Sequence, residues 1–416
     1  MVAQYPNARQ QANYLKHFRA DSIVKDAELL RVHLLGEKGK WTLLGQSYGG
    51  FVAVHYLSMY QESLSGAIIC GGLPPITKSN PDQIYADLYL KLQEYNNQYY
   101  GRYPEDAKKV ISICDILSNR LEKEYPVLLP GGGILTPKRF LSLGTYFGYF
   151  GGFETVHYFI EKSLENSALL SPTSSSPAST FSPGAGAAGS GSASLAFASS
   201  EAVSIASAAS SVLPSTFEED FSFNFLREFE SFFSFESNPI YAVLHESIYC
   251  QGESSNWSAD RMRSEFPNFD SQRFFESRKV LRHVPSDVQM STEKSIPAPA
   301  NIAANTSASR LNFTSEMIYR EMFDEYPQLN LLKDAAEILA SFSGWSSLYD
   351  LDALENNSVP VAAVVYFDDL YVSRDLSLEC AKHIRGIKLW ITNEYYHSGL
   401  KDDGETILSK LIQLLS

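Results

Sequence analysis

The stretch WTLLGQSYGGFVAVHYL, residues 41–57, decides the fold class. The apolar run at 41–45 is typical of a short buried strand, and residues 51–61 predict a helix. Between them Ser47 occupies the middle of a Gly-x-Ser-x-Gly pattern, and residues 64–72 predict the next strand. Strand, glycine turn, helix and strand in this order are typical of a parallel α/β sheet.

Ser47 lies where a sharp strand-to-helix turn would present its hydroxyl at the carboxyl end of the sheet. The following helix would point its N-terminus at the reacting atoms, and the flanking glycines would leave room for the turn. The backbone N–H of Tyr48 would then donate to an oxyanion hole. We therefore interpret Ser47 as a nucleophile rather than as a serine that lies between two glycines by chance.

A serine nucleophile needs a general base and an acid that orients the base, in the chain order Ser, Asp or Glu, His for this architecture. The apolar run at 359–369 predicts a strand that stops at two aspartates, and 387–393 predicts the last strand. His397 follows that last strand and is the predicted base. The predicted acid is Asp368 or Asp369, and periodicity alone does not separate the two.

Composition limits the partners and the compartment. The 416-residue chain is 44% hydrophobic and carries a net charge of −14, which argues against nucleic acid or an anionic membrane as the partner. No apolar run is long enough for a membrane span, and the first residues lack the apolar core of a signal peptide, so we expect a cytoplasmic protein. The four cysteines lie far apart, and we expect neither a metal site, a cofactor nor a disulfide framework.

The chain divides into three predicted parts. Residues 1–75 form the first part of the core with the elbow, 76–358 form a helical lid inserted between sheet strands, and 359–416 complete the core. Within the lid, the Ser-, Ala-, Gly- and Pro-rich residues 167–216 and a second segment, 284–310, read as low-complexity insertions. The Phe-rich residues 217–237 predict a lid helix that is buried against its neighbours.

An amphipathic helix is predicted at residues 21–36. Asp21 can cap its start and Gly36 can end it. Four apolar side chains have the spacing of one buried helix face: Ile23, Ala27, Leu30 and Leu34.

Separate segments along nearly the whole chain resemble the prolyl aminopeptidases, also called proline iminopeptidases. They include HFRADSIVKDAELLR, WTLLGQSYGGFVAVHYLS, SNPIYAVLHESIYCQG, FTSEMIY and VPVAAVVYFDDLYVSRDLSLECAKHIRGIKLWITNEYYHSGL. The resemblance implies an α/β-hydrolase fold and removal of an N-terminal proline, and sometimes of other residues, from peptides. It implies Ser47 as nucleophile and His397 as base, and it favours Asp369 over Asp368 because Asp369-Leu-Tyr-Val-Ser fits the family's frame better.

The resemblance also implies that lid glutamates bind the free amine of the substrate. Glu246 in LHESIYC and Glu316 in FTSEMIY match those motifs. A buried carboxylate would pair with the ammonium and reject blocked peptides. The alternative for each is an ordinary solvated or capping glutamate. The expected partner is a peptide with a free N-terminus, and the oligomeric state is left open.

The sequence departs from the family at its start. Family members begin with strands that carry a His-Gly-Gly-Pro-Gly-type loop and an Asp-x-Arg-Gly motif, and neither motif occurs in this chain. We therefore expect an N-terminally incomplete sheet whose elbow strand has an unpaired edge and an uncovered apolar face. Loss of the loop's oxyanion donor would cost about 10²–10³ in rate.

Three functional hypotheses follow. The first is a serine aminopeptidase that works through an acyl-enzyme. The second is an esterase or amidase with the same Ser–His–Asp set, which would not need the lid glutamates. The third is a truncated or catalytically impaired relative without enzymatic activity, which the missing loop favours and the intact set of three residues disfavours.

Overall fold

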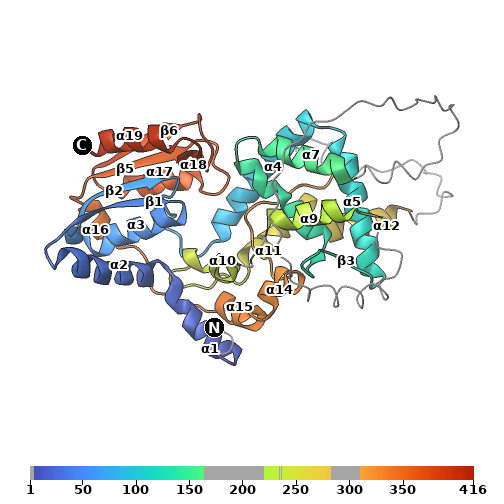
Figure 1. Cartoon of the computed structure of the whole chain (residues 1–416), viewed down its shortest axis with the longest axis horizontal. Helices are drawn as coiled ribbons and strands as arrows, with labels where there is room; N and C mark the ends of the chain where they lie inside the picture. Colours follow the sequence, from blue (N-terminus) through green and yellow to red (C-terminus); the bar gives the residue numbers. More distant parts are fainter. Residues whose placement is uncertain (1–3, 164–219, 234, 236, 283–309) are drawn as a thin grey trace, which may run out of the picture.

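The computed structural model describes residues 4–163, 220–233, 235, 237–282 and 310–416. The predicted insertion at 167–216 and nearly all of that at 284–310 lie outside the described residues. A layered part built on a sheet occupies one side of the molecule, and a helical lid occupies the other (Figure 1).

The sheet of the core has four parallel strands in the order β1-β2-β5-β6. Their bounds are β1 Trp41–Gln46, β2 Leu64–Cys70, β5 Val361–Tyr366 and β6 Ile387–Thr392. The central pair β2 and β5 is in register from Ala67 opposite Val361 to Cys70 opposite Val364. The four predicted strands therefore exist, and chain segments from the two ends of the sequence meet at the centre of one sheet.

Alternating side chains of the strands bury the two faces of this sheet. Ala67 and Ile69 of β2 pack with Val361 and the helices on one face. Ile68 and Cys70 pack on the other face with the C-terminal helix, where Ile407 is fully buried. Because both faces are covered, the central strands read as continuous apolar runs in the sequence.

The helices of the core begin with a pair at the N-terminus. Their bounds are α1 Ala8–Leu15, η1 Lys16–Phe18, α2 Ala20–Leu35, α3 Tyr48–Met59, η2 Gln61–Ser63, α16 Leu351–Glu355, α17 Arg374–Lys382, α18 Gly399–Asp402 and α19 Gly404–Leu415. Helices α2 and α3 lie beside each other below the sheet, and α19 lies above it in the view of Figure 1.

The lid is mostly helical and has its own hydrophobic core. Its elements are α4 Asp82–Arg102, α5 Asp106–Glu122, β3 Val127–Leu128, β4 Ile134–Leu135, α6 Pro137–Leu141, η3 Ser142–Gly148, α7 Gly152–Ser163, α9 Phe223–Phe232, α10 Pro239–Leu244, η4 Ser247–Tyr249, α11 Ser258–Arg263, η5 Pro267–Phe269, α12 Ser271–Arg282, α13 Met322–Glu325, α14 Pro327–Asn330 and α15 Lys333–Ala340. The antiparallel pair β3–β4 was not expected from the sequence.

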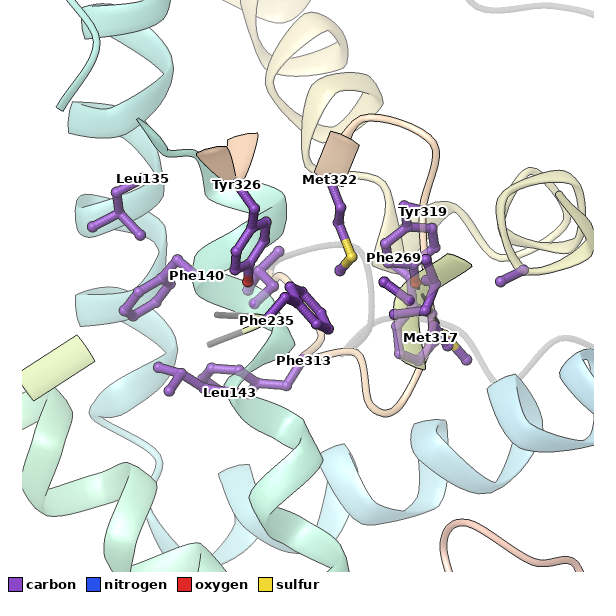
Figure 2. Packing of buried hydrophobic residues seen from close by; sticks show 14 of the residues in the cluster. Leu135, Phe140, Leu143, Phe235, Phe269, Phe313, Met317, Tyr319, Met322 and Tyr326 are labelled. Carbon is purple, nitrogen blue, oxygen red and sulfur yellow. Dashed lines mark hydrogen bonds between the residues drawn. The ribbon is translucent and has the colours of Figure 1, made fainter. Parts of the chain in front are cut away.

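Aromatic side chains fill the core of the lid. Figure 2 shows Phe140, Phe235, Phe313 and Tyr326 meeting between lid segments that are far apart in the sequence. In the Phe-rich stretch, α9 buries Phe225 and Phe229 against α7. The prediction of a packed lid helix in that stretch is therefore confirmed.

We keep the division into core segments 1–75 and 359–416 and a lid at 76–358 as a proposal. Two elements pack across that division. Helix α1 packs on α15 of the lid, and α16 packs on α3 of the core.

The predicted buried face of the helix at 21–36 is wrong. The structure buries Ala20, Val24 and Arg31 instead. Leu30 and Leu34 are 58% and 68% exposed. Ala20 and Val24 pack in one buried cluster with residues of α3, and of the predicted face only Ala27 is half-buried against this cluster. The helix ends at Leu35 as expected, because Gly36 takes a φ of 77°, whereas no side chain caps its start, so the predicted cap at Asp21 is wrong.

Strand β1 is at the edge of the sheet, as the sequence predicted. It is not buried, however, because Leu44 is 53% exposed and only Gly45 of this strand is buried. Leu29 of the neighbouring helix α2 is 72% exposed as well. An apolar surface therefore accompanies the edge strand that leads into Ser47.

Cys70, Cys114, Cys250 and Cys380 are all buried and carry free thiols. Burial raises the pKa of Cys70 to about 12, which keeps the thiol protonated at neutral pH. In the part of the chain that the structure describes, none of the helices combines the length and the apolar character needed to cross a membrane.

Candidate active site

Ser47 occupies the turn between β1 and α3 in a conformation that few non-glycine residues adopt. Its φ is 53° and its ψ is −125°. Two backbone hydrogen bonds hold the turn: Ser47 N–H donates to Cys70 O at 3.0 Å, and Gly50 N–H donates to Ser47 O at 2.8 Å. A strained backbone at a strand-to-helix turn is the geometry of a nucleophile elbow.

Glycines permit this turn because no side chain would fit. A Cβ on Gly45 would lie 2.3 Å from the carbonyl oxygen of Gly49, and one on Gly72 would lie 2.3 Å from the carbonyl oxygen of Ser47. Glycines that follow β2 are therefore as necessary for the elbow as those of the Gly-x-Ser-x-Gly pattern. Helix α3 begins at Tyr48, and N–H groups in the first helical turn have no partner within the helix.

Asp369 and His397 form a buried pair beyond the ends of β5 and β6. Asp369 Oδ2 lies 2.7 Å from Nδ1 of His397, and the two residues are 2% and 9% exposed. The other carboxylate oxygen accepts from the backbone N–H groups of Tyr371 at 2.8 Å and Val372 at 3.0 Å. The carboxylate is thus fixed by its own loop, while the neighbouring Asp368 is exposed.

The environment of His397 raises the pKa of the imidazole above its ordinary value. Burial is the largest single influence and lowers this pKa, but the charge of Asp369, its hydrogen bond and the charge of Glu316 together outweigh burial. The pair can therefore stabilise an imidazolium that forms when a proton is taken from a hydroxyl.

A cavity of about 360 Å³ opens in front of Ser47, between the core and the lid. Its wall next to Ser47 carries Tyr48, and its lid wall carries Glu316. Tyr371 also lines the cavity, and its ring centroid lies 4.9 Å from that of His397, so the buried Asp–His pair adjoins the same space. The remaining lining residues are mostly apolar: Phe18, Ile23, Phe51, Asn238, Ile240, Tyr241, Leu244, His245, Ile248, Tyr249 and Val372.

Glu316 is the carboxylate that reaches this cavity. It is half-buried, and the hydroxyl of Tyr241 donates to its Oε1. A second cavity of about 280 Å³ adjoins on the lid side and shares Asn238, Tyr241 and Glu316 with the first. Glu316 therefore offers a negative charge to a ligand that lies in front of Ser47.

Glu246 has a different position from the one expected. Its carboxylate is buried at the start of α11, where its two oxygens accept from Ser258 N–H at 3.0 Å and Ala259 N–H at 2.9 Å. Burial raises its pKa to about 6, while these backbone donors and Ser255 act to lower it. Glu246 does not line the cavity of Ser47, so the capping alternative describes its contacts better than amine binding does.

Three further side chains at the site carried no recognisable sequence signal. Tyr241 donates to Glu316, Tyr371 lies beside His397, and Lys91 of the lid helix α4 donates to the backbone carbonyl of Asp369. Tyr241 and Tyr371 are two of 24 tyrosines in the chain, and Lys91 is a lysine on a long helix, so neither residue type stands out in the sequence. Only the folded arrangement singles them out.

Metal ligands do not gather at this site. Among the described residues, no group of three or more His, Cys, Asp or Glu side chains could hold a metal ion. The arrangement present is a hydroxyl on an elbow, a buried Asp–His pair and a carboxylate across the cavity. Such groups perform acyl transfer with organic side chains alone.

The sheet, the elbow and the order of Ser, Asp and His define an α/β-hydrolase. The family profile described as alpha/beta hydrolase fold matches residues 5–123 of the chain. More particularly, the chain belongs to the proline iminopeptidase family. It is 34% identical over 408 residues to a proline iminopeptidase of Aeromonas sobria, and the aligned residues cover 98% of this chain and 74% of the relative.

Two other relatives carry the same name, proline iminopeptidase. A proline iminopeptidase of Aspergillus aculeatus is 28% identical over 417 residues, covering 99% of this chain and 73% of that protein. A proline iminopeptidase of Thermoplasma volcanium is 32% identical over 98 residues, which cover 23% of this chain and 33% of the relative. The relatives are proline iminopeptidases, which are serine peptidases, and the first two extend the similarity to the lid.

Proposed function

We propose that this chain is a serine aminopeptidase that releases an N-terminal residue, preferentially proline, from peptides. The observation that carries the proposal is the buried Asp369–His397 pair beside a cavity that Ser47 and Glu316 both line. The relatives from Aeromonas and Aspergillus bear the name of this activity. Ser47 is the proposed nucleophile, His397 the base and Asp369 the residue that orients the base.

In the proposed reaction, Ser47 Oγ attacks the carbonyl carbon of the N-terminal residue while Nε2 of His397 takes the hydroxyl proton. The carboxylate of Asp369 accepts a hydrogen bond from Nδ1–H of His397 and stabilises the imidazolium. The backbone N–H of Tyr48 donates to the oxyanion of the tetrahedral intermediate. The imidazolium then protonates the leaving amine, and water, activated by His397, hydrolyses the acyl-enzyme to free the amino acid.

Selection of a free N-terminus is assigned to Glu316. Its carboxylate would pair with the substrate ammonium in a cavity whose other walls are mostly apolar, where such a charge-assisted contact is strong. A peptide with a blocked amine would leave the carboxylate without its cationic partner. This is the property that separates an aminopeptidase from an esterase or amidase with the same triad.

A pair of substrates tests the proposal. We expect the purified chain to cleave proline anilide, to leave the N-acetylated anilide nearly uncleaved, and to lose the activity on Ser47→Ala substitution. Cleavage of both substrates at similar rates would contradict the aminopeptidase assignment. Absence of any Ser47-dependent turnover would support the alternative of a catalytically impaired relative.

A further inference from the structure

The loop that carries the proposed acid is held from the lid as well as from the core. The ammonium of Lys91 donates to the backbone carbonyl of Asp369, and the hydroxyl of Tyr95 donates to the carbonyl of Asp368. Lys91 and Tyr95 are four residues apart on α4, so they lie on the same face of that helix. Two consecutive carbonyls of the acid loop thus meet two donors from one lid helix.

Both donors are sheltered from water. Tyr95 is 6% exposed and Lys91 is half-buried. The pKa of Lys91 is lowered from its ordinary value, because burial outweighs the opposing charges of Asp369 and Asp368. A charge-assisted hydrogen bond in such surroundings is stronger than a neutral one at the surface.

Helix α4 is itself fixed in the lid by hydrogen bonds, so it can hold the loop of Asp369 in place. Asn96, which is fully buried, donates to Phe313 O at 2.9 Å and accepts from Phe313 N–H at 2.7 Å. About two turns earlier on the same helix, the hydroxyl of Tyr89 donates to Ala259 O at 2.8 Å. The helix therefore connects the interior of the lid to the loop of Asp369.

The carboxylate of Asp369 can face His397 only while the backbone of the loop after β5 keeps its position. Inside the loop, Asp369 N–H donates to Tyr366 O at 3.3 Å, which is a long hydrogen bond. A shift of the loop would move Oδ2 away from Nδ1, and misplacement of a catalytic group by about 1 Å can cost roughly 10²-fold in rate.

We propose that Lys91 and Tyr95 are positioning residues, which couple the lid to the acid–base pair by holding the Asp368–Asp369 backbone in place. They touch neither substrate nor the reacting atoms and act through Asp369. The inference rests on the proposed function for its kinetic test, and it has a second test that needs no turnover.

The experiment compares Lys91→Met and Tyr95→Phe with a control on the same helix, Arg102→Met. Arg102 pairs with Glu154 at the surface, and its side chain is 57% exposed. For Lys91→Met we expect kcat on proline anilide to fall about tenfold with KM nearly unchanged, because one charge-assisted hydrogen bond to the acid loop is lost. Tyr95→Phe should lower kcat by less, Lys91→Arg should restore part of it, and Arg102→Met should leave both parameters unchanged.

The independent readout is the strongly deshielded NMR signal of the His397 Nδ1 proton, assigned by its loss in His397→Gln. The signal should broaden or disappear in Lys91→Met and persist in Arg102→Met. A folded Lys91→Met variant with wild-type kcat and an intact signal overturns the inference. If Lys91→Met does not fold, Tyr95→Phe decides by the same criteria. If the wild-type chain shows the signal but no turnover, the proposed function fails and the signal alone tests the coupling.

Discussion

Asp368 and Asp369 are neighbours in the chain, yet their side chains have opposite surroundings. Asp369 is buried against His397, and Asp368 is exposed. The sequence narrowed the acid to these two residues, and the family frame favoured Asp369. The same holds for the two lid glutamates: both match family motifs, but Glu316 reaches the cavity and Glu246 caps α11.

The two aspartates give a matched pair of variants. We expect Asp369→Asn to lower kcat by about 10⁴-fold, because an amide holds the imidazole in the wrong tautomer. Asp368→Asn should leave kcat nearly unchanged. Steady-state kinetics on proline anilide measures both. Equal losses in the two variants would contradict the assignment of Asp369.

The pH dependence of the wild-type chain follows from His397. Burial lowers the pKa of His397, Asp369 and Glu316 together raise it by more, and the result is a pKa above the ordinary value of about 6.5. The base must be neutral to act, so kcat/KM should rise with pH through an apparent pKa above 6.5 and be lost as pH falls below it. A pH–rate profile with its acid limb centred below 6.5 would disagree with this environment.

Glu316 and Glu246 form a second matched pair. Glu316→Gln should lower kcat/KM for substrates with a free amine by about 10- to 100-fold, because the ammonium loses its charged partner. Glu246→Gln keeps the size of the side chain but leaves only one of the two acceptors for the N–H groups of Ser258 and Ala259, so it should lower stability while KM stays nearly unchanged. Thermal melting of both variants would show whether folding is affected. A larger rise in KM for Glu246→Gln than for Glu316→Gln would reverse the two roles.

At the scale of elements, most strands and helices could be predicted, because local apolar patterns specify them. Residues 67–70 of β2 and 361–366 of β5 form continuous apolar runs, since both faces of the sheet are covered there. Helix α2 was predicted with nearly the right ends but with the wrong buried face. Small and polar groups make its contact: the Arg31–Glu28 pair joins Tyr56 and Ser63 from the core, whereas Leu34 faces outward.

A comparison of two α2 variants tests this corrected face. Val24 is fully buried, so Val24→Ala should lower the free energy of unfolding by about 2 kcal/mol through lost burial and a residual cavity. Leu34→Ala removes a larger side chain from an exposed position and should change it by less than about 0.5 kcal/mol. Urea unfolding curves measure both values. A greater loss for Leu34→Ala would mean that the exposed leucine is covered in solution.

At the scale of the whole molecule, Arg19 joins the core to the lid. It is 1% exposed, and its guanidinium donates to the carbonyls of Ser247 at 3.1 Å, Cys250 at 2.7 Å and Ser346 at 3.2 Å. Ser247 and Cys250 flank Ile248 and Tyr249, which line the cavity in front of Ser47. One side chain therefore holds a wall of the proposed substrate site against the core.

Removal of this cation should loosen the lid. We expect Arg19→Met to lower the free energy of unfolding by at least about 3 kcal/mol, because two buried carbonyls and the part-buried carbonyl of Ser346 lose their donor. Arg9→Met, at an exposed position of α1, is the control and should have little effect. Urea unfolding and limited proteolysis of the loop around Tyr249 measure the change. Wild-type stability and protease resistance in Arg19→Met would show that other contacts hold the lid.

The sequence by itself determined the tight turn at Ser47, the parallel strands and helices around it, and the chain order Ser47, Asp369, His397 of the proposed nucleophile, acid and base. These features depend on short-range patterns: apolar periodicity, glycines at a tight turn and residues at strand ends. Only the tertiary structure decided which of two adjacent aspartates meets His397, which glutamate faces the cavity, and which side of α2 is buried. It also placed Lys91 on the acid loop. Those choices depend on contacts between separate segments, 28 residues apart for Asp369 and His397 and 278 residues apart for Lys91 and Asp369, and no local pattern records how such segments pack.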